Sequence, residues 1–467
     1  MSKRNQLPAL MVSLAITGAL VAGGGWLIKE TFFSEGASFL PTSSEPDGMM
    51  QGADGSSGKS VLPGEASEAK QQGLDAMATG DLASAKVAFT QALQENRNDP
   101  ESLIYLNNAK IGSNAAYTIA LSVPTSKFTN PSLEIMRGVA QAQETINQSV
   151  GVNGTPLKVL LLNDQGDLEK AKEVANSLVE NPDVLGVIGH YASDTTLVTA
   201  DVYETGKLPM ISATSTAVKI SESGEYIFRT VPSDRLAAST LSRYVLNTLS
   251  KKQAAVFYTG KSEYSQSVKS EFTTELLSNG GRVVANFDID DPTFSSGSAV
   301  QAAKAAGAEV LMLALTEATE ARSLQILSVN SGELAVVGGD SLYDYNILDS
   351  GREDAVGLTV AVPWHVLGNP QSSFVQTSQQ LWGGGVSWRT ATAYDAVLTI
   401  AAAIEQGGAT RESIAETMAG AGFSVDGATG VVSFLPDGDL NQPSQLVTVV
   451  KKPGGPSGTG FDYEPVQ

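Results

Sequence analysis

Cysteine is absent from this sequence of 467 residues, and histidine is almost absent. Without cysteine the chain has no disulfide bond, no thiol nucleophile, no thiolate metal ligand and no N-terminal cysteine that could carry a lipid. The two histidines, His190 and His365, leave little for zinc chemistry. We therefore expect neither a metal nor another cofactor.

Positive charge is also scarce. Thirty Lys and Arg residues face fifty Asp and Glu residues, which gives a formal net charge of -20. Such an acidic surface repels phosphate backbones and anionic lipid headgroups, so we expect no nucleic-acid partner. With 42% hydrophobic and 17% charged residues the composition is that of a globular protein, and the length predicts roughly two to four domains.

The N-terminus contains an uncharged stretch at residues 7–28, preceded by Lys3 and Arg4. As a helix this stretch would be about 33 Å long, enough to cross a bilayer. We predict a transmembrane anchor at residues 1–30 that is retained, although small residues at 19–25 leave cleavage open. The positive charge before the stretch places the remainder in the periplasm or another extracytoplasmic space, anchored to the inner (plasma) membrane.

Residues 31–64 are rich in Ser, Gly, Pro and acidic residues, which predicts a flexible linker. Residues 65–112 instead place apolar residues at helical spacing around a turn at Gly80 and Asp81. This pattern predicts two antiparallel helices and resembles a tetratricopeptide repeat. One repeat cannot bury its own apolar face, so it must pack on the next domain, on another copy or on a partner. A spacer or oligomerisation helix pair and a protein-binding module both remain open.

From residue 116 onward, short apolar runs such as VLGVI at 184–188 alternate with amphipathic helical segments. This is the pattern of parallel strands joined by crossover helices. A second series follows a break at 229–234, and another break near 360–363 precedes further helices and strands. The second series predicts strands near 254–258, 282–287, 309–314 and 334–337, and the last segment predicts strands near 431–434 and 446–451. The sequence thus predicts an α/β protein with two α/β units.

Polar residues gather where the predicted strands end, which is where open parallel sheets bind ligands. In chain order these residues are Tyr191, Ala192 and Ser193, then Thr214 and Thr216, then Thr316 and Glu317, and finally Asp340. Each residue alone has a structural explanation as a cap or turn residue. As an N-cap, however, Ser193 and the amides after it suit a carboxylate. Asp340, after two glycines, suits an ammonium group, and both poles together suit an α-amino acid.

Several motifs resemble those of the type I periplasmic binding proteins, in particular the branched-chain amino acid (Leu/Ile/Val) binding proteins of ABC transporters. They include SLEIMRGVAQAQETIN at 132–147, VIGHYASDTT at 187–196, LPMISATST at 208–216, YIFRTVPSD at 226–234, GGD at 338–340, DAVGLTVAVP at 354–363 and ATAYDAVLTIAAAIEQGG at 391–408. The resemblance implies a two-lobed ligand-binding domain at 113–452 with three crossovers in its hinge. Lobe one would span 114–231 and 363–433, and lobe two 232–362 and 434–452, leaving 453–467 as a flexible tail.

The resemblance also implies roles for single residues. Ser193 and Thr216 would hold the ligand's carboxylate and ammonium, Thr214 would contribute its carbonyl, Asp340 would bind the ammonium, and Tyr264 would close over the ligand from lobe two. Pro131, and the pair Thr316 and Glu317, stand where the family commonly has aromatic residues that contact the ligand. We therefore expect an altered side-chain pocket in which Glu317 meets a polar or basic group, lined also by Tyr191, Phe128, Tyr343 and Trp364.

These features suggest a membrane-tethered, extracytoplasmic solute-binding protein of an ABC transporter. It would close by hinge motion around a small amino-acid-like ligand and deliver it to an ABC permease. An alternative is a ligand sensor or scaffold that signals to a protein partner through the helical hairpin without a transporter. An enzyme is disfavoured, because the sequence has no GxSxG motif, no metal-ligand cluster and no plausible Ser-His-Asp arrangement.

Overall fold

The computed structural model describes residues 58–466 of the chain. The predicted membrane anchor at 1–30 and residues 31–57 of the predicted linker lie outside the described residues. Within the described part, no helix combines the length and the apolar character needed to cross a bilayer.

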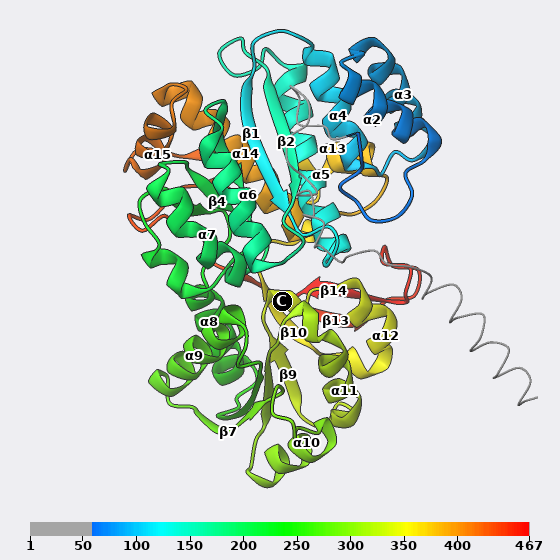
Figure 1. Ribbon diagram of the computed structural model, residues 1–467. Helices are drawn as coiled ribbons and strands as arrows, with labels where there is room; N and C mark the ends of the chain where they lie inside the picture. Colours follow the sequence, from blue (N-terminus) through cyan, green and yellow to red (C-terminus); the bar gives the residue numbers. More distant parts are fainter. Residues whose placement is uncertain (1–57, 467) are drawn as a thin grey trace, which may run out of the picture. The chain divides into compact units, whose positions relative to one another are not determined.

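Lobe one contains a parallel sheet with the strand order β2-β1-β3-β4-β5 (Figure 1). Its strands are β1 (Tyr117–Val123), β2 (Leu157–Asn163), β3 (Val184–Ile188), β4 (Met210–Ser212) and β5 (Ile227–Arg229). Its helices are α5 (Thr129–Gln148), α6 (Leu168–Glu180), α7 (Ser193–Thr205), the 3-10 helix η1 (Val218–Glu222), α13 (Ser373–Trp382), α14 (Trp388–Gly407) and α15 (Arg411–Ala419), followed by the short strands β11 (Val425–Asp426) and β12 (Val431–Val432).

Both faces of this sheet are covered, because successive strand side chains point to opposite sides. In β1, Ile119 and Leu121 join a hydrophobic cluster with α5 and α14, whereas Ala120 joins another with α6 and α7. A parallel sheet buried on both faces explains why its strands are almost continuously apolar.

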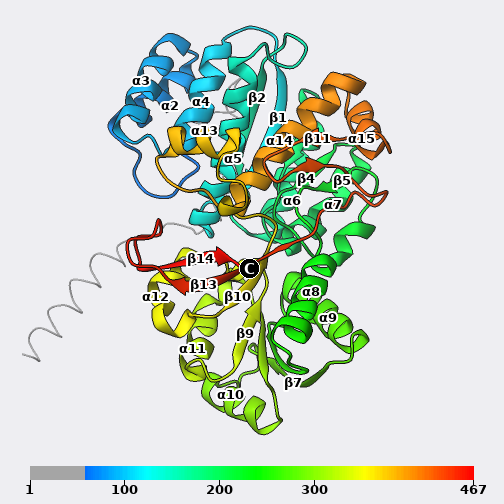
Figure 2. The same cartoon turned by 180° about the vertical axis from the view of Figure 1, so that it is seen from behind.

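Lobe two has the strand order β14-β13-β10-β9-β8-β6-β7 (Figure 2). Its parallel strands are β6 (Gln253–Tyr258), β7 (Arg282–Asp288), β8 (Val310–Ala314), β9 (Ala335–Gly338) and β10 (Thr359–Val362), and β13 (Gln445–Lys451) and β14 (Phe461–Pro465) are antiparallel. Its helices are α8 (Asp234–Arg243), the π-helix η2 (Tyr244–Thr248), α9 (Glu263–Ser278), α10 (Ser296–Ala305), η3 (Glu317–Thr319), α11 (Glu320–Asn330), η4 (Asp340–Leu342), α12 (Tyr345–Ala355) and η5 (Val366–Gly368). Helices α8 and α9 cover one face of the sheet, and α10, α11 and α12 cover the other.

The chain crosses between the lobes after β5, after β10 and after β12, which is the expected pattern of three crossovers. The predicted flexible tail at 453–467 is wrong, because strand β14 lies within it. Val447 to Lys451 of β13 pair with Pro465 to Phe461, and the Tyr463 hydroxyl donates to the carbonyl of Leu342 at 2.6 Å. Lobe two therefore extends to the last described residues.

Three helices precede lobe one: α2 (Glu68–Thr79), α3 (Leu82–Glu95) and α4 (Pro100–Ile111). Gly80 ends α2 in the left-handed conformation with φ 77°, and Asp81 caps α3 by accepting from the Ser84 amide at 3.1 Å. Leu103 and Ile104 of α4 belong to the same hydrophobic cluster as the core of lobe one. The helical segment thus packs on the next domain, one of the outcomes left open by the sequence; its kinship to tetratricopeptide repeats and a protein partner stay predictions.

A buried ion cluster holds the start of this segment together. Lys70 of α2 contacts Asp99 at 3.0 Å and Glu101 at 2.7 Å, and all three residues are buried. Burial disfavours the Lys70 cation, but Glu101 and Asp99 outweigh that effect and raise its pKa. Glu101 also accepts from the Val61 amide at 2.8 Å. The end of the predicted flexible linker, residues 58–64, is therefore partly fixed against α4.

Helix α4 also covers the outer edge of strand β2. The Asn108 side chain donates to the Val159 carbonyl at 2.8 Å and accepts from the Val159 amide at 3.2 Å, as a neighbouring strand would. Gln143 of α5 donates to the Asn108 oxygen at 2.9 Å and holds it in place. The helical segment is thus a structural part of lobe one.

Candidate functional site

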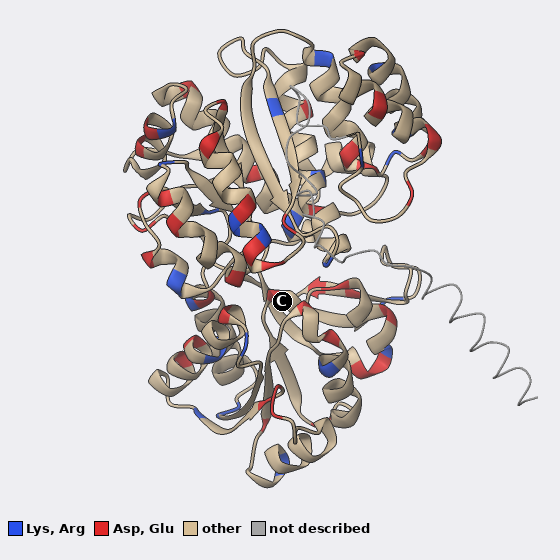
Figure 3. Ribbon diagram, in the orientation of Figure 1, with Lys and Arg blue, Asp and Glu red and all other residues tan. Residues whose placement is uncertain are grey.

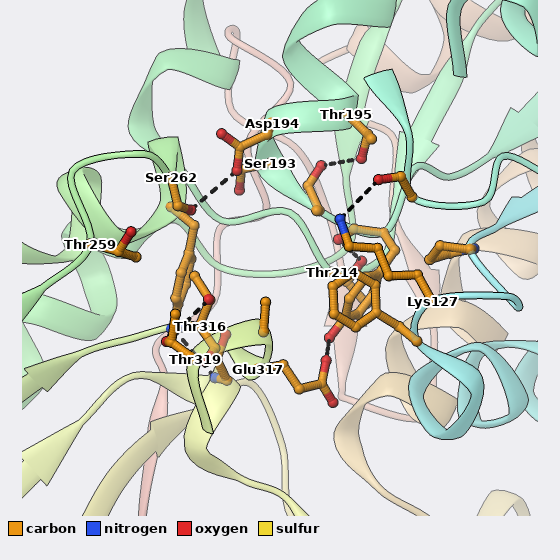
Figure 4. Close-up of a pocket in the computed structure, with 18 of the residues that line it drawn as sticks. Lys127, Ser193, Asp194, Thr195, Thr214, Thr259, Ser262, Thr316, Glu317 and Thr319 are labelled. Carbon is orange, nitrogen blue, oxygen red and sulfur yellow. Dashed lines mark hydrogen bonds between the residues drawn. The ribbon is translucent and has the colours of Figure 1, made fainter. Parts of the chain in front are cut away.

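A cavity of about 390 Å³ lies at the carboxyl ends of the strands of both lobes. Most of the predicted ligand-binding residues line it, namely Phe128, Tyr191, Ala192, Ser193, Thr214, Tyr264, Thr316, Glu317 and Asp340, whereas Thr216, Tyr343 and Trp364 do not. Figure 4 shows Ser193 and Thr195 on one side of this cavity and Thr316 and Glu317 on the other. Its volume is within the range of about 300–1,000 Å³ found for small-molecule sites.

The lobe-one side of the cavity is built on the start of helix α7. This helix begins at Ser193 with Ala192 in the N-cap position, so the prediction that Ser193 is the N-cap is wrong by one residue. The physical reason is that the Ser193 hydroxyl accepts from the Ala217 amide at 3.3 Å instead of capping its own helix. The first turn of α7 still presents amide groups and the positive end of the helix dipole at the cavity, which favours an anion there.

The neighbouring loop is fixed by hydroxyl groups that hold backbone carbonyls. The Thr214 hydroxyl donates to the Tyr191 carbonyl at 2.7 Å, and the Ser212 hydroxyl donates to the His190 carbonyl at 2.9 Å. His190 is itself buried between Asp164 at 2.6 Å and the Tyr203 hydroxyl at 3.0 Å. The histidine therefore supports the loop from behind and does not line the cavity.

The lobe-two side presents Asp340, which is 8% exposed. The Tyr264 hydroxyl donates to Asp340 Oδ1 at 2.7 Å. A Cβ atom on Gly339 would lie 2.3 Å from that hydroxyl oxygen, so glycine is required for this approach. Burial raises the pKa of Asp340, while the Tyr264 hydrogen bond and the nearby Arg389 charge oppose the rise. Asp340 is a buried acceptor suited to a cationic group.

Thr216 lies next to the cavity but not in its wall, contrary to the prediction. It is 4% exposed, and its carbonyl accepts from the Asp234 amide at 2.9 Å at the start of the first crossover. Burial raises the pKa of Asp234 to about 7, and the Asp340 charge adds to this effect. The Thr216 carbonyl thus connects lobe one to the first crossover. Asp234, at this crossover, is a second buried carboxyl group that the sequence analysis did not single out.

Glu317 forms another part of the lobe-two wall. The Tyr191 hydroxyl of lobe one donates to Glu317 Oε2, and the Phe128 ring lies 5.3 Å from the Tyr191 ring. Burial raises the pKa of Glu317 to about 7, although the Arg389 charge and the Tyr191 hydrogen bond oppose the rise. The departure from the family pattern noted at this position therefore places a carboxyl group inside the cavity.

Arg389 and Trp388 are lining residues that the sequence analysis missed. They open helix α14, and Arg389 is fully enclosed, with its Nη1 atom 3.1 Å from Glu134 Oε2 and 3.2 Å from the Tyr343 carbonyl. Burial disfavours the Arg389 cation, but the surrounding acidic groups hold its pKa above the ordinary value. Arg389 is the only basic residue in the sequence of α14, but nothing in the local pattern shows that its side chain is buried.

Other predicted lining residues lie elsewhere. Tyr343 stacks on Tyr463 at 4.3 Å, and Trp364 packs in the core against Phe374 at 5.7 Å. Pro131 is also outside the cavity wall. Large aromatic rings fill protein cores more often than ligand sites, and the sequence pattern cannot separate the two uses.

Direct contacts between the lobes close one rim of the cavity. Asp194 of α7 accepts from the Glu263 amide at 2.9 Å and from the Ser262 hydroxyl at 3.1 Å. Beside it, Lys219 pairs with Glu263 at 2.6 Å, and the Val218 amide donates to Ser267 at 3.0 Å. These contacts hold the start of α9 in lobe two against lobe one.

Acidic and basic residues are interspersed along the helices of both lobes (Figure 3). Within residues 58–466, no group of three or more His, Asp or Glu side chains is arranged to hold a metal ion.

Comparisons with known proteins agree with this architecture. The periplasmic binding protein family model matches residues 117–455. The Leu/Ile/Val-binding protein homolog 3 of Brucella melitensis is 26% identical over 69% of this chain and 87% of its own length. The leucine-, isoleucine-, valine-, threonine- and alanine-binding protein of Pseudomonas aeruginosa is also 26% identical, over 65% of this chain and 81% of its own.

A solved structure shows the same fold. The leucine-binding protein of Thermotoga maritima superposes with a TM-score of 0.65 and 21% identity over 75% of this chain and 98% of its own. The family match spans both lobes, all three crossovers and the cavity between them. The chain belongs to the periplasmic binding protein family.

Proposed function

We propose that the chain is an extracytoplasmic solute-binding protein of an ABC-type transporter and that it binds an α-amino acid in the cavity. The observation that carries this proposal is the placement of two opposite poles. The first turn of α7 at Ser193 favours an anion, and Asp340 on the other lobe favours a cation. An α-amino acid carries both groups on one carbon atom, so it can join the lobes.

The curated relatives support this choice, since they are named as binding proteins for leucine, isoleucine, valine, threonine or alanine. They are binding proteins and not enzymes, which agrees with the expectation that the chain has no catalytic activity. Delivery of the ligand to an ABC permease and attachment to the membrane through residues 7–28 are parts of the same proposal. Both would be tested by co-purification from membranes.

The binding itself is tested by calorimetry of the full chain against the common α-amino acids. We expect at least one to bind, and Asp340→Asn to weaken that binding by about 2 kcal/mol or more, roughly 30-fold, because the ligand ammonium loses a buried charged partner. Asp354→Asn, at an exposed position of lobe two, is the matched control and should bind as the wild type does. Undiminished binding by the Asp340→Asn variant would refute the assigned site.

A further inference from the structure

The cavity contains a second carboxyl group, Glu317, which the two poles for an α-amino acid do not use. Glu317 starts the 3-10 helix η3 directly after strand β8 and lines the cavity with Thr316 and Thr319 on either side. The Tyr191 hydroxyl donates to it from lobe one. Glu317 therefore lines the same cavity as Ser193 and Asp340, where it can meet the side chain of a bound ligand.

The charged groups around Glu317 do not fully neutralise its carboxylate. Among the described residues, Arg389 forms an ion pair with Glu134, whereas Glu317 forms no ion pair. The carboxyl group of Asp344 also acts on Glu317 and adds to the rise of its pKa. One guanidinium group thus serves several carboxyl groups, so the wall carries excess negative charge.

Two lysine residues also line the cavity, but their charges are not paired with Glu317 in the described part of the chain. Lys261 lies 3.7 Å from Asp290, and the Lys127 ammonium donates to the Gly166 carbonyl at 3.2 Å. Both lysine side chains are exposed, so solvent screens their charge. Among the described residues, neither lysine forms an ion pair with Glu317.

An aliphatic ligand side chain would remove water from the Glu317 carboxylate without donating a hydrogen bond in its place. A terminal ammonium or guanidinium group would instead donate charge-assisted hydrogen bonds to it. We propose that Glu317 determines specificity and selects α-amino acids with a basic side chain. This inference rests on the proposed function, because it assumes that Ser193 and Asp340 already hold the α-carboxylate and α-ammonium groups.

One feature of the same wall favours a competing ligand. Trp388 Nε1 and Arg389 Nε have no hydrogen-bond partner among the described residues. A side-chain amide could accept from such groups while donating to Glu317. Glutamine is therefore the alternative that the experiment must separate from a basic amino acid.

The test compares L-lysine with L-norleucine, which has the same carbon skeleton without the terminal amino group, by calorimetry of the full chain. We expect lysine to bind roughly 10- to 100-fold more tightly than norleucine, the effect of one hydrogen bond to a charged group. In Glu317→Gln this advantage should fall to a few-fold at most, while norleucine binding stays unchanged or improves. Glu333→Gln, on the exposed surface of lobe two, is the control.

The outcomes separate the two proposals. Tighter binding of norleucine or leucine than of lysine would overturn the role of Glu317, and if Asp340→Asn abolished that binding the proposed function would stand. Tighter binding of glutamine would overturn the choice of a basic ligand. A lysine preference that persists in Glu317→Gln would assign selectivity to another residue, and binding of no α-amino acid would overturn both proposals.

Discussion

Replacing Asp194 with alanine should weaken ligand binding by destabilising the closed arrangement of the lobes. Asp194 lies in the first turn of α7, yet its carboxylate accepts from the Glu263 amide and the Ser262 hydroxyl at the start of α9 in the other lobe. A carboxylate at the N-terminus of a helix satisfies an unpaired amide and is favoured by the helix dipole. These contacts are lost whenever the lobes separate.

The magnitude follows from the two hydrogen bonds. A hydrogen bond to a charged group contributes about 1.5–3 kcal/mol, and the helix terminus adds about 0.3–1 kcal/mol. Asp194 is only partly buried, and water replaces both donors in the open form, so the two hydrogen bonds together contribute about as much as one buried hydrogen bond to a charged group. We expect a loss of about 1.5–3 kcal/mol of closure free energy, which raises Kd roughly 10- to 100-fold.

The assay combines calorimetry with stopped-flow dissociation of the amino acid that binds most tightly. Because the contacts form after the ligand enters, most of the effect should appear as faster dissociation. Asp201→Ala, at an exposed position on the same helix, is the control and should resemble the wild type. Wild-type affinity and dissociation rate in Asp194→Ala would show that these contacts do not hold the lobes together.

Two further predictions concern other charged groups. Lys70→Met should lower the free energy of unfolding in urea by about 3–5 kcal/mol, because it leaves two buried carboxylates without a cationic partner. Lys86→Met, at an exposed position, is the control and should change the free energy of unfolding little. A loss below about 1 kcal/mol in Lys70→Met would contradict this reasoning. The lysine-to-norleucine affinity ratio should rise from pH 6 to pH 8, because the pKa of Glu317 is about 7 and a basic side chain must displace its proton at lower pH. Titration calorimetry should detect that proton release, and an unchanged pH dependence in Glu317→Gln would contradict it.

Much of the fold could be predicted because buried parallel strands leave a strong pattern. Apolar runs alternate with amphipathic helices, and this pattern located most of the strands and the breaks at 229–234 and 360–363, whereas the number of crossovers came from the family resemblance. Strand β14 was missed because its sequence, FDYEP, is short, carries two charges and follows a glycine-rich stretch. Its pairing with β13 is a tertiary contact that local sequence does not encode.

The candidate site was predicted in part for the same reason. Groups at strand ends, such as Ser193 and Asp340, could be placed because parallel strands share one carboxyl edge. Arg389 could not, because it reaches the cavity from the start of a helix distant in sequence and its partner Glu134 lies 255 positions earlier. Thr216 lies beside the cavity wall and not in it, a difference of position that the sequence of a polar loop does not encode.

The amide of Asn108 has a consequence for where the protein can be shortened. A chain beginning at residue 114, where the sequence suggested that lobe one starts, would lack α4 and leave the outer edge of β2 open at Val159. Open strand edges recruit further strands, so such a fragment should self-associate as its concentration rises. Helix α4 therefore protects this edge of lobe one, and a shortened chain that keeps the edge covered would have to begin before α4.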